Sequence, residues 1–285
     1  MPDKLIINAA LTGMVPTKAD NRALPVTPAE IAADARRCVA AGASILHLHA
    51  RDADGRPTPR ADIYREILER VRDACPDAIL CVSTSGRIHR TFEERAAVLD
   101  LPTHANRARP EMASLTLGSM NFARDASINA PDMIHALAKR MQERNILPEL
   151  EVFEPGMAEY ARYLLKHNLL PAHRPLYINI LLGSRGTLSA SPTNFAFMLE
   201  CLPPNAIWAA TGIGRFQFDI QRLAIESGGH VRTGLEDALF MDPEKRDPAT
   251  NPRLIERVAA HARTLGRNIA SSAETRTLLQ LPPPA

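Results

Sequence analysis

The sequence predicts an α/β fold, a (β/α)8 TIM barrel in which parallel strands alternate with helices. Short apolar runs typical of buried strands alternate with amphipathic stretches along the 285 residues. Strict alternation of this kind indicates parallel strands. The length agrees, because α/β barrels commonly use about 250 residues as one domain. We therefore expect residues 1–285 to form a single barrel domain, with 278–285 as a C-terminal tail.

Eight strand–helix pairs can be followed in order along the chain. A capping box of Thr27 and Glu30, with Pro28 in the first turn, marks the start of the first helix, and Gly42 follows its end. No linker divides the series, which favours closure into a barrel over the alternative, a doubly wound open sheet. The expected pairs are 5–8 with 29–41, 44–49 with 61–74, 79–83 with 92–99, 112–116 with 131–144, 149–153 with 157–166, 177–180 with 193–202, 207–210 with 218–227 and 230–233 with 252–265.

Composition and charge exclude several classes of function. The formal net charge is +2 and basic residues are spread along the chain, so the basic patch of a nucleic-acid-binding protein is missing. No apolar run approaches the ~18 residues of a membrane span. The four cysteines lie in apolar segments without a C-x-x-C pair, which favours reduced thiols and a cytoplasmic protein. We expect a small-molecule partner, with no nucleic acid and no membrane.

Two histidines stand on the second expected strand, at positions 47 and 49. Side chains alternate along a strand, so His47 and His49 share one face and Leu46 and Leu48 share the other. In a barrel the leucines would face the helices, leaving the histidines inside near the end that carries active sites. For an arbitrary H-x-H, one buried and one surface histidine is the commoner arrangement. Here the surrounding run is apolar, and one metal ion would satisfy both imidazoles.

A catalytic zinc site typically has three protein ligands, so a carboxylate is needed. Glu236 follows the eighth expected strand beside Gly234 and can reach inward. The ordinary alternative is that Glu236 and Asp237 form the solvated first turn of a helix. Its place at the end of a strand makes the metal-ligand interpretation stronger. The sequence therefore predicts one divalent ion, with zinc as the expected metal, held by His47, His49 and Glu236.

Other polar residues gather at the same predicted end of the barrel. Glu149 and Glu151 share a face of the fifth strand, and inside a barrel they would be buried acids that need hydrogen bonds, cations or a role. We expect both to contact the substrate. The segment 182–187, LGSRGT, could offer amides and a guanidinium to a phosphate, although such a turn is often only structural. Hydroxyl and amide groups at strand ends come from Ser83, Thr84, Ser85, Thr116, Ser119 and Asn179.

Several segments, in order, resemble the β-keto acid cleavage enzymes, the family typified by 3-keto-5-aminohexanoate cleavage enzyme. H-x-H-x-R-D combined with the late G-G-H-x-R-x-G-x-E-D is specific, and the likeness covers essentially the whole chain. The segments are NAALTG (8–13), PVTPAEI (25–31), AGASILHLHARD (41–52), STSG (83–86), SLTLGS (114–119), PELEVF (148–153) and GGHVRTGLED (228–237).

The resemblance implies a zinc-dependent acyltransferase that converts a β-keto acid and acetyl-CoA into acetoacetate and an acyl-CoA by Claisen and retro-Claisen chemistry. It implies that Asp237 is the catalytic base, that Arg232 supports it, and that Ser83 and Thr116 help to hold the substrate. It also implies a homotetramer. The chemistry is reasonable, because a Lewis-acidic metal stabilises the enolate formed when a base removes the proton beside the keto group.

One position departs from the family pattern. Members acting on an amino-bearing keto acid carry an acidic residue just after the early Thr-Gly, where this chain has Met14 and Val15. We therefore expect Met14 to contact a substrate with a neutral or apolar tail, although the nearby Lys18 could attract an anion. Alternative functions are a metal-dependent aldolase, a zinc hydrolase of the amidohydrolase type, and a non-catalytic metabolite-binding barrel.

Overall fold

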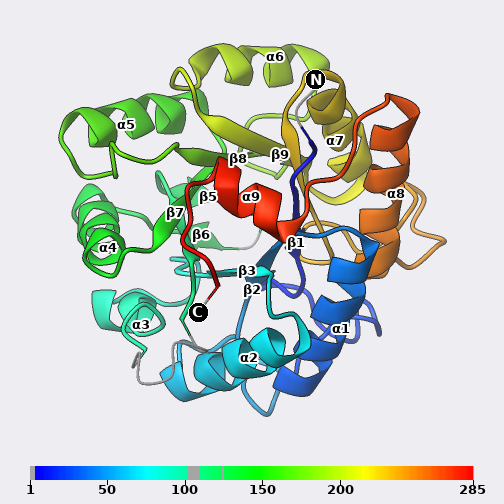
Figure 1. The fold of residues 1–285 in the computed structure, drawn as a ribbon, viewed down its shortest axis with the longest axis horizontal. Helices are drawn as coiled ribbons and strands as arrows, with labels where there is room; N and C mark the ends of the chain where they lie inside the picture. Colours follow the sequence, from blue (N-terminus) through cyan, green and yellow to red (C-terminus); the bar gives the residue numbers. More distant parts are fainter. Residues whose placement is uncertain (1–3, 102–108, 124, 285) are drawn as a thin grey trace.

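In a computed structural model, which describes residues 4–101, 109–123 and 125–284, eight parallel strands close into a barrel (Figure 1). Each barrel strand pairs in parallel with the next, and β10 pairs with β1 to complete the ring. The predicted barrel is confirmed, and an open sheet is excluded. The strands are β1 (Ile7–Ala10), β2 (Ile45–Leu48), β3 (Ile79–Val82), β4 (Met112–Thr116), β7 (Leu147–Val152), β8 (Tyr177–Leu182), β9 (Ile207–Gly212) and β10 (His230–Thr233).

In the described parts of the chain, eight helices surround this ring and follow the strands in the predicted order (Figure 1). The capping box of Thr27 and Glu30 forms as expected at the start of the first helix. The sequence did not predict the antiparallel hairpin of β5 (Met120–Asn121) and β6 (Ala126–Ser127), the 3-10 turn η1 (Gly214–Phe216) or the helix α9 (Ser272–Leu278). The surrounding helices are α1 (Pro28–Ala41), α2 (Ala61–Ala74), α3 (Phe92–Ala96), α4 (Pro131–Glu143), α5 (Pro155–Lys166), α6 (Pro192–Cys201), α7 (Gln217–Glu226) and α8 (Asn251–Thr264).

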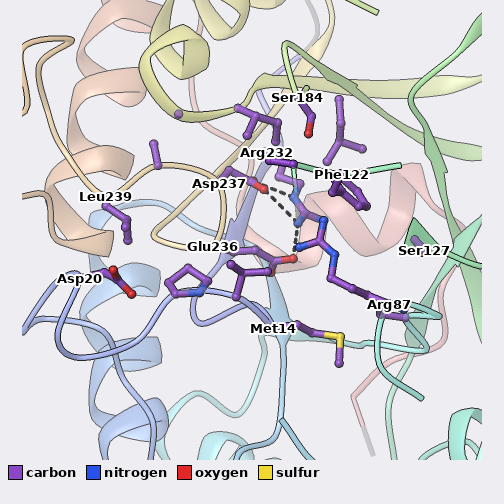
Figure 2. A pocket seen from close by; sticks show the side chains of 18 of the residues that line it. Met14, Asp20, Arg87, Phe122, Ser127, Ser184, Arg232, Glu236, Asp237 and Leu239 are labelled. Atoms are coloured by element: carbon purple, nitrogen blue, oxygen red, sulfur yellow. Dashed lines mark hydrogen bonds and ion pairs between the residues drawn. The ribbon is translucent and has the colours of Figure 1, made fainter. Parts of the chain in front are cut away.

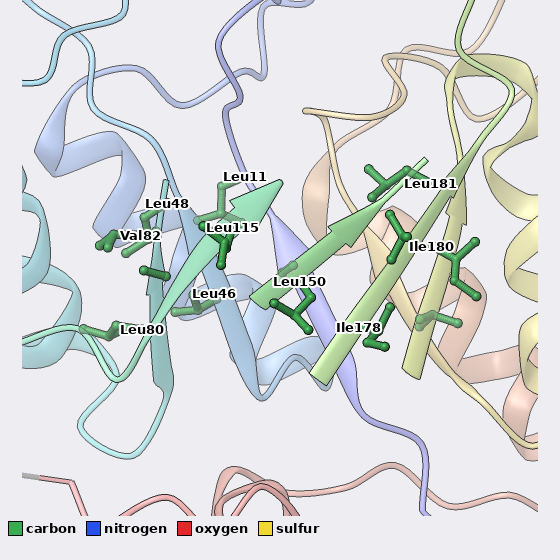
Figure 3. Packing of buried hydrophobic residues seen from close by; sticks show 14 of the residues in the cluster. Leu11, Leu46, Leu48, Leu80, Val82, Leu115, Leu150, Ile178, Ile180 and Leu181 are labelled. Carbon is green, nitrogen blue, oxygen red and sulfur yellow. The ribbon is translucent and has the colours of Figure 1, made fainter. Parts of the chain in front are cut away.

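The main hydrophobic core lies between the strands and the helices. Leu46 and Leu48 of β2 are fully buried in it, beside Leu80 and Val82 of β3 (Figure 3). This confirms that the leucine face of β2 points outward to the helices, because side chains alternate along a strand. The opposite face of each strand is left for the barrel interior, where the polar residues gather.

A second apolar cluster fills the end of the barrel at which the strands begin. Ile6, Ile45 and Ile79 pack there against Leu279 and Leu281 from the C-terminal segment, and all five side chains are buried. Figure 1 shows α9, in red, crossing the middle of the ring of helices. The segment that we expected to be a tail thus packs across one end of the barrel, and the polar interior faces the other end.

Two further observations concern the chain as a whole. Within the described ranges, no helix combines the length and apolarity that crossing a bilayer requires. Cys38, Cys75 and Cys81 are buried free thiols, and Cys201 is a half-buried one.

Candidate metal centre and active site

His47 and His49 meet inside the barrel. Strand β2 ends at Leu48, so His47 lies on its inner face and His49 directly follows on the same side. Both side chains are buried, and their Nε2 atoms lie 3.1 Å apart. Two imidazole nitrogens thus point at one location near the carboxyl end of the strand, as the alternation of side chains predicted.

Glu236 reaches the same location from the loop after β10. Its Oε1 lies 3.3 Å from His49 Nε2, and its Oε2 lies 3.7 Å from His47 Nε2. Two glycines allow the loop to approach so closely. Gly234 has φ +151°, and an added Cβ would lie 2.0 Å from Ala10 O; a Cβ on Gly13, φ +68°, would lie 2.6 Å from Glu236 Cγ. Both positions require glycine for space and for backbone conformation.

The three groups fit a divalent metal ion. One ligand atom from each of His47, His49 and Glu236 lies within 4.8 Å of the others. Glu236 Oε2 is buried without a hydrogen-bond partner in the described chain, although buried polar atoms are normally satisfied. Burial alone would lower the pKa of His47, but the carboxylates of Glu149 and Glu236 raise it to about 9. The cluster therefore attracts positive charge, and its donor set is one that zinc prefers.

Cys81 and Glu149 form a second group of possible ligands on the other side of His47. Glu149 Oε2 lies 2.6 Å from His47 Nδ1 and accepts a hydrogen bond from Cys81 Sγ at 3.2 Å. The other oxygen, Oε1, accepts hydrogen bonds from the side-chain amides of Asn179, at 2.7 Å, and Asn8. Burial raises the pKa of the Cys81 thiol well above its usual value, so the thiolate that metals prefer is disfavoured. Glu149 is saturated by donors, which suits a carboxylate that orients His47.

Arg232 of β10 connects the metal cluster to two further acids. Its Nη2 lies 2.8 Å from Glu236 Oε1, and its Nε donates to Asp237 Oδ2 at 2.9 Å (Figure 2). Its Nη1 donates to Glu151 Oε1 at 3.1 Å. Thr116 in turn donates to Glu151 Oε2 at 2.7 Å. Burial raises the pKa of Asp237 to about 6, although Arg232 acts in the opposite direction. Asp237 is thus a carboxyl group held by a fixed cation beside the metal cluster.

A cavity of about 740 Å³ opens above these groups. Arg51, two residues after His49, supports its rim by donating to Gly13 O at 2.6 Å and to Pro16 O at 3.0 Å. Sequence reasoning did not single out Arg87 and Phe122, which also line the cavity. Arg87 follows the STSG motif, but nothing in the sequence indicates which way its side chain points. The predicted site residues in the lining are Met14, His47, His49, Ser83, Thr116, Glu151, Arg232, Glu236 and Asp237; Glu149 lies below it.

Comparison with known proteins identifies the family. A family model described as beta-keto acid cleavage enzyme matches residues 4–281. The chain belongs to this family. The chain is 40% identical over 282 residues to the 3-keto-5-aminohexanoate cleavage enzyme of Fusobacterium nucleatum, and the match covers 99% of each chain. It is 36% identical over 285 residues to the 3-oxoadipate:acetyl-CoA acetyltransferase of Cupriavidus necator, covering 99% of this chain and 96% of that one.

Among solved structures, the chain resembles apo ObcA with a TM-score of 0.77 and 23% identity, over 91% of this chain and 66% of ObcA. This likeness supports the barrel fold alone. The family resemblance noted in the sequence is confirmed, and its motifs converge in space: the early Thr-Gly, the H-x-H-x-R-D segment and the late Gly-x-Glu-Asp segment meet at the carboxyl ends of β1, β2 and β10.

Proposed function

We propose that this β-keto acid cleavage enzyme uses one zinc ion to convert a β-keto acid and acetyl-CoA into acetoacetate and an acyl-CoA. The observation that carries the proposal is the cluster of His47, His49 and Glu236 beside the pair of Asp237 and Arg232, all facing one cavity. The names of the two relatives, a β-keto acid cleavage enzyme and an acetyl-CoA acetyltransferase, support this class of reaction.

The metal ligands are assigned from the donor set. His47, His49 and Glu236 would hold the ion, and three protein ligands suit a catalytic zinc site, which keeps one position for substrate. Bound zinc supplies a Lewis acid that polarises the keto group. Glu149 would orient His47 through Nδ1. We therefore assign Glu149 to positioning His47 rather than to the substrate contact predicted from the sequence.

Asp237 would act as the base. It removes the proton from the carbon between the keto and carboxylate groups, and the resulting carbanion attacks the thioester carbonyl of acetyl-CoA. The CoA thiolate expelled from the adduct then attacks the keto carbon that came from the β-keto acid. Retro-Claisen cleavage breaks the bond between that carbon and the former carbanion carbon, Asp237 returns its proton to the latter, and acetoacetate and acyl-CoA are released. Arg232 holds the Asp237 carboxylate in place and is itself fixed by Glu151, so the base keeps its orientation.

The remaining cavity residues would bind the substrate. Ser83 and Thr116 place hydroxyl groups in the lining, and the ion pair of Glu151 with Arg232 completes that wall. Met14 lies where an acidic residue would be needed to pair with an ammonium group, so an amino-bearing substrate lacks a partner there. We propose that such substrates are used poorly.

A panel of β-keto acids assayed with and without acetyl-CoA tests the reaction. We expect turnover only with acetyl-CoA; cleavage without it would indicate an aldolase or a hydrolase instead. Elemental analysis should find zinc in the purified protein. The variant His49→Ala should lose metal and activity together, whereas Asp237→Asn should keep the metal and lose turnover. An active Asp237→Asn enzyme would disprove the assignment of the base.

We also propose that the chain forms a single domain, assembles as a homotetramer and works in the cytoplasm. The family resemblance supports the tetramer, and the free thiols of the described residues suit a reducing compartment. Light scattering of the purified enzyme tests the assembly, with a mass near four times 31.2 kDa as the expected result.

A further inference from the structure

Arg87 is a cationic side chain in the cavity wall that the proposed reaction does not use. It follows β3, and its guanidinium carbon lies 3.5 Å above the centre of the Phe122 ring. Phe122 directly follows β5 of the hairpin, so the aromatic ring is presented by a separate element. In Figure 2 the Arg87 side chain extends from the wall toward the region of Glu236 and Arg232. Stacking on an aromatic ring fixes a guanidinium while leaving its N–H donors available.

The guanidinium of Arg87 makes no ion pair in the described chain, and the carboxylates of Glu236, Asp125 and Glu151 act on it only from a longer distance. Among the residues that the structure describes, no carboxylate oxygen lies within 4 Å of it and its N–H groups make no hydrogen bond; only the backbone N–H of Arg87 donates, to Ser85 Oγ. Arg232, by contrast, pairs with three carboxylates, and Arg51 donates to backbone oxygens. A half-buried guanidinium that makes no direct ion pair is suited to binding an anionic group of a ligand.

We propose that Arg87 binds a carboxylate at the far end of the substrate, so that the preferred substrate is a dicarboxylic β-keto acid. This inference rests on the proposed function, in which the shared keto acid end of every substrate lies at the cluster of His47, His49 and Glu236. Arg232 is committed to the acids around that cluster. A second carboxylate on the substrate would therefore need another cation, and Arg87 supplies it.

The other basic residues of the lining are better placed to contact CoA than the keto acid. Arg215 lies in η1, and Lys245 is exposed in the loop after β10. The phosphates of CoA are carried at the end of a long pantetheine arm, so they are expected outside the reacting centre, near such loops. Lys18, which the sequence suggested as a partner for an anion, pairs instead with Glu30 and is absent from the lining. The expectation of a neutral or apolar tail is replaced by this proposal.

Two six-carbon substrates that differ in the terminal group test the inference: 3-oxoadipate, with a second carboxylate, and 3-oxohexanoate, with a methyl group. With acetyl-CoA saturating, the zinc-loaded wild-type enzyme should prefer 3-oxoadipate. Arg87→Gln should lower kcat/KM for 3-oxoadipate by about 10- to 100-fold, as expected for losing a charge-assisted hydrogen bond, and change that for 3-oxohexanoate less than about threefold. Arg87→Lys should restore part of the preference.

Matched controls separate this inference from its alternatives. Arg56→Gln removes the same charge from an exposed loop outside the lining and should leave the ratio of the two kcat/KM values unchanged within about threefold. Equal losses for both substrates with Arg87→Gln, a rise in the KM for acetyl-CoA, or a wild-type preference for 3-oxohexanoate would each overturn the proposal for Arg87. Failure of the wild-type enzyme to turn over any β-keto acid with acetyl-CoA would instead refute the proposed function on which it rests.

Discussion

The role of Glu149 can be tested by removing its charge while keeping its shape, with Glu149→Gln. The carboxylate lies 2.6 Å from His47 Nδ1 through Oε2 and accepts from Asn8 and Asn179 through Oε1. The Oδ1 atoms of both asparagines have no hydrogen-bond partner in the described chain. Both amides can therefore turn over and accept from the new NH2 group, so the barrel should tolerate the change.

What Glu149→Gln removes is the anionic acceptor for His47. A ligand histidine that loses its supporting carboxylate typically binds its metal 10- to 100-fold more weakly, or about 1.4–2.8 kcal/mol. We expect a loss in this range for zinc, measured by competition with a chromophoric chelator. The melting temperature of the metal-free protein should change little, because the hydrogen bonds can be rebuilt.

Glu151→Gln is the matched control for this prediction. The residue lies two positions further along β7 on the same inner face, but it contacts Arg232 and Thr116 instead of a histidine. The substitution Glu151→Gln makes the same chemical change, but Glu151 contacts none of the proposed zinc ligands directly. It should therefore alter the affinity for zinc less than about threefold. Equal losses of affinity in the two variants, or none with Glu149→Gln, would refute the assignment of Glu149 to orienting His47.

Three further variants probe other parts of the site and the barrel. Gly13→Ala should displace Glu236 and weaken zinc binding about tenfold or more. Gly55→Ala is its control, because Gly55 also has a positive φ but its added Cβ would meet only Val26 Cγ1, at 3.7 Å. The control should lower the melting temperature without changing the affinity for zinc. Met14→Glu should raise kcat/KM for an amino-bearing β-keto acid about tenfold relative to 3-oxohexanoate, and an unchanged ratio would contradict our account of that position. Burial lowers the pKa of His230 to about 3, so the contribution of its neutral form to stability is complete above pH 6.5 and falls by up to about 1.4 kcal/mol per pH unit on acidification toward pH 3. His230→Asn should therefore flatten the pH dependence of the free energy of unfolding in this range. An unchanged slope would disprove the contribution of His230.

The barrel and the metal cluster could be predicted because both rest on local regularities. Alternation along β2 places His47 and His49 together whatever the rest of the chain does. The alternation of strands and helices along the chain indicates parallel strands, and the carboxyl ends of parallel strands all lie at the same end of the barrel. The position of Glu236 could not be predicted from local regularity alone, because its approach to the two histidines depends on two glycines far apart in the sequence. Its place after the eighth expected strand, beside Gly234, indicated Glu236, and the late family motif supported the assignment.

The features that the sequence did not predict are the depth of a side chain inside the barrel and the orientation of side chains in loops. Alternation indicated that Glu149 and Glu151 face inward, but it does not say that one lies below the cavity and the other lines it. Arg87 stands in a loop, where no periodicity specifies the direction of a side chain. The helix α9 is only seven residues long; its capping box at Ser271 was readable, yet so short a segment has little helical pattern.

The apolar floor of the barrel has a consequence for the order of events in catalysis. With Leu279 and Leu281 sealing one end of the described barrel, all reactants and products pass through the opposite opening. Under the proposed function a keto acid binds at the cluster of His47, His49 and Glu236, and acetyl-CoA then has to approach it through that same opening. We therefore expect compulsory-order kinetics in which the keto acid enters before acetyl-CoA, and acyl-CoA departs before acetoacetate is free to escape.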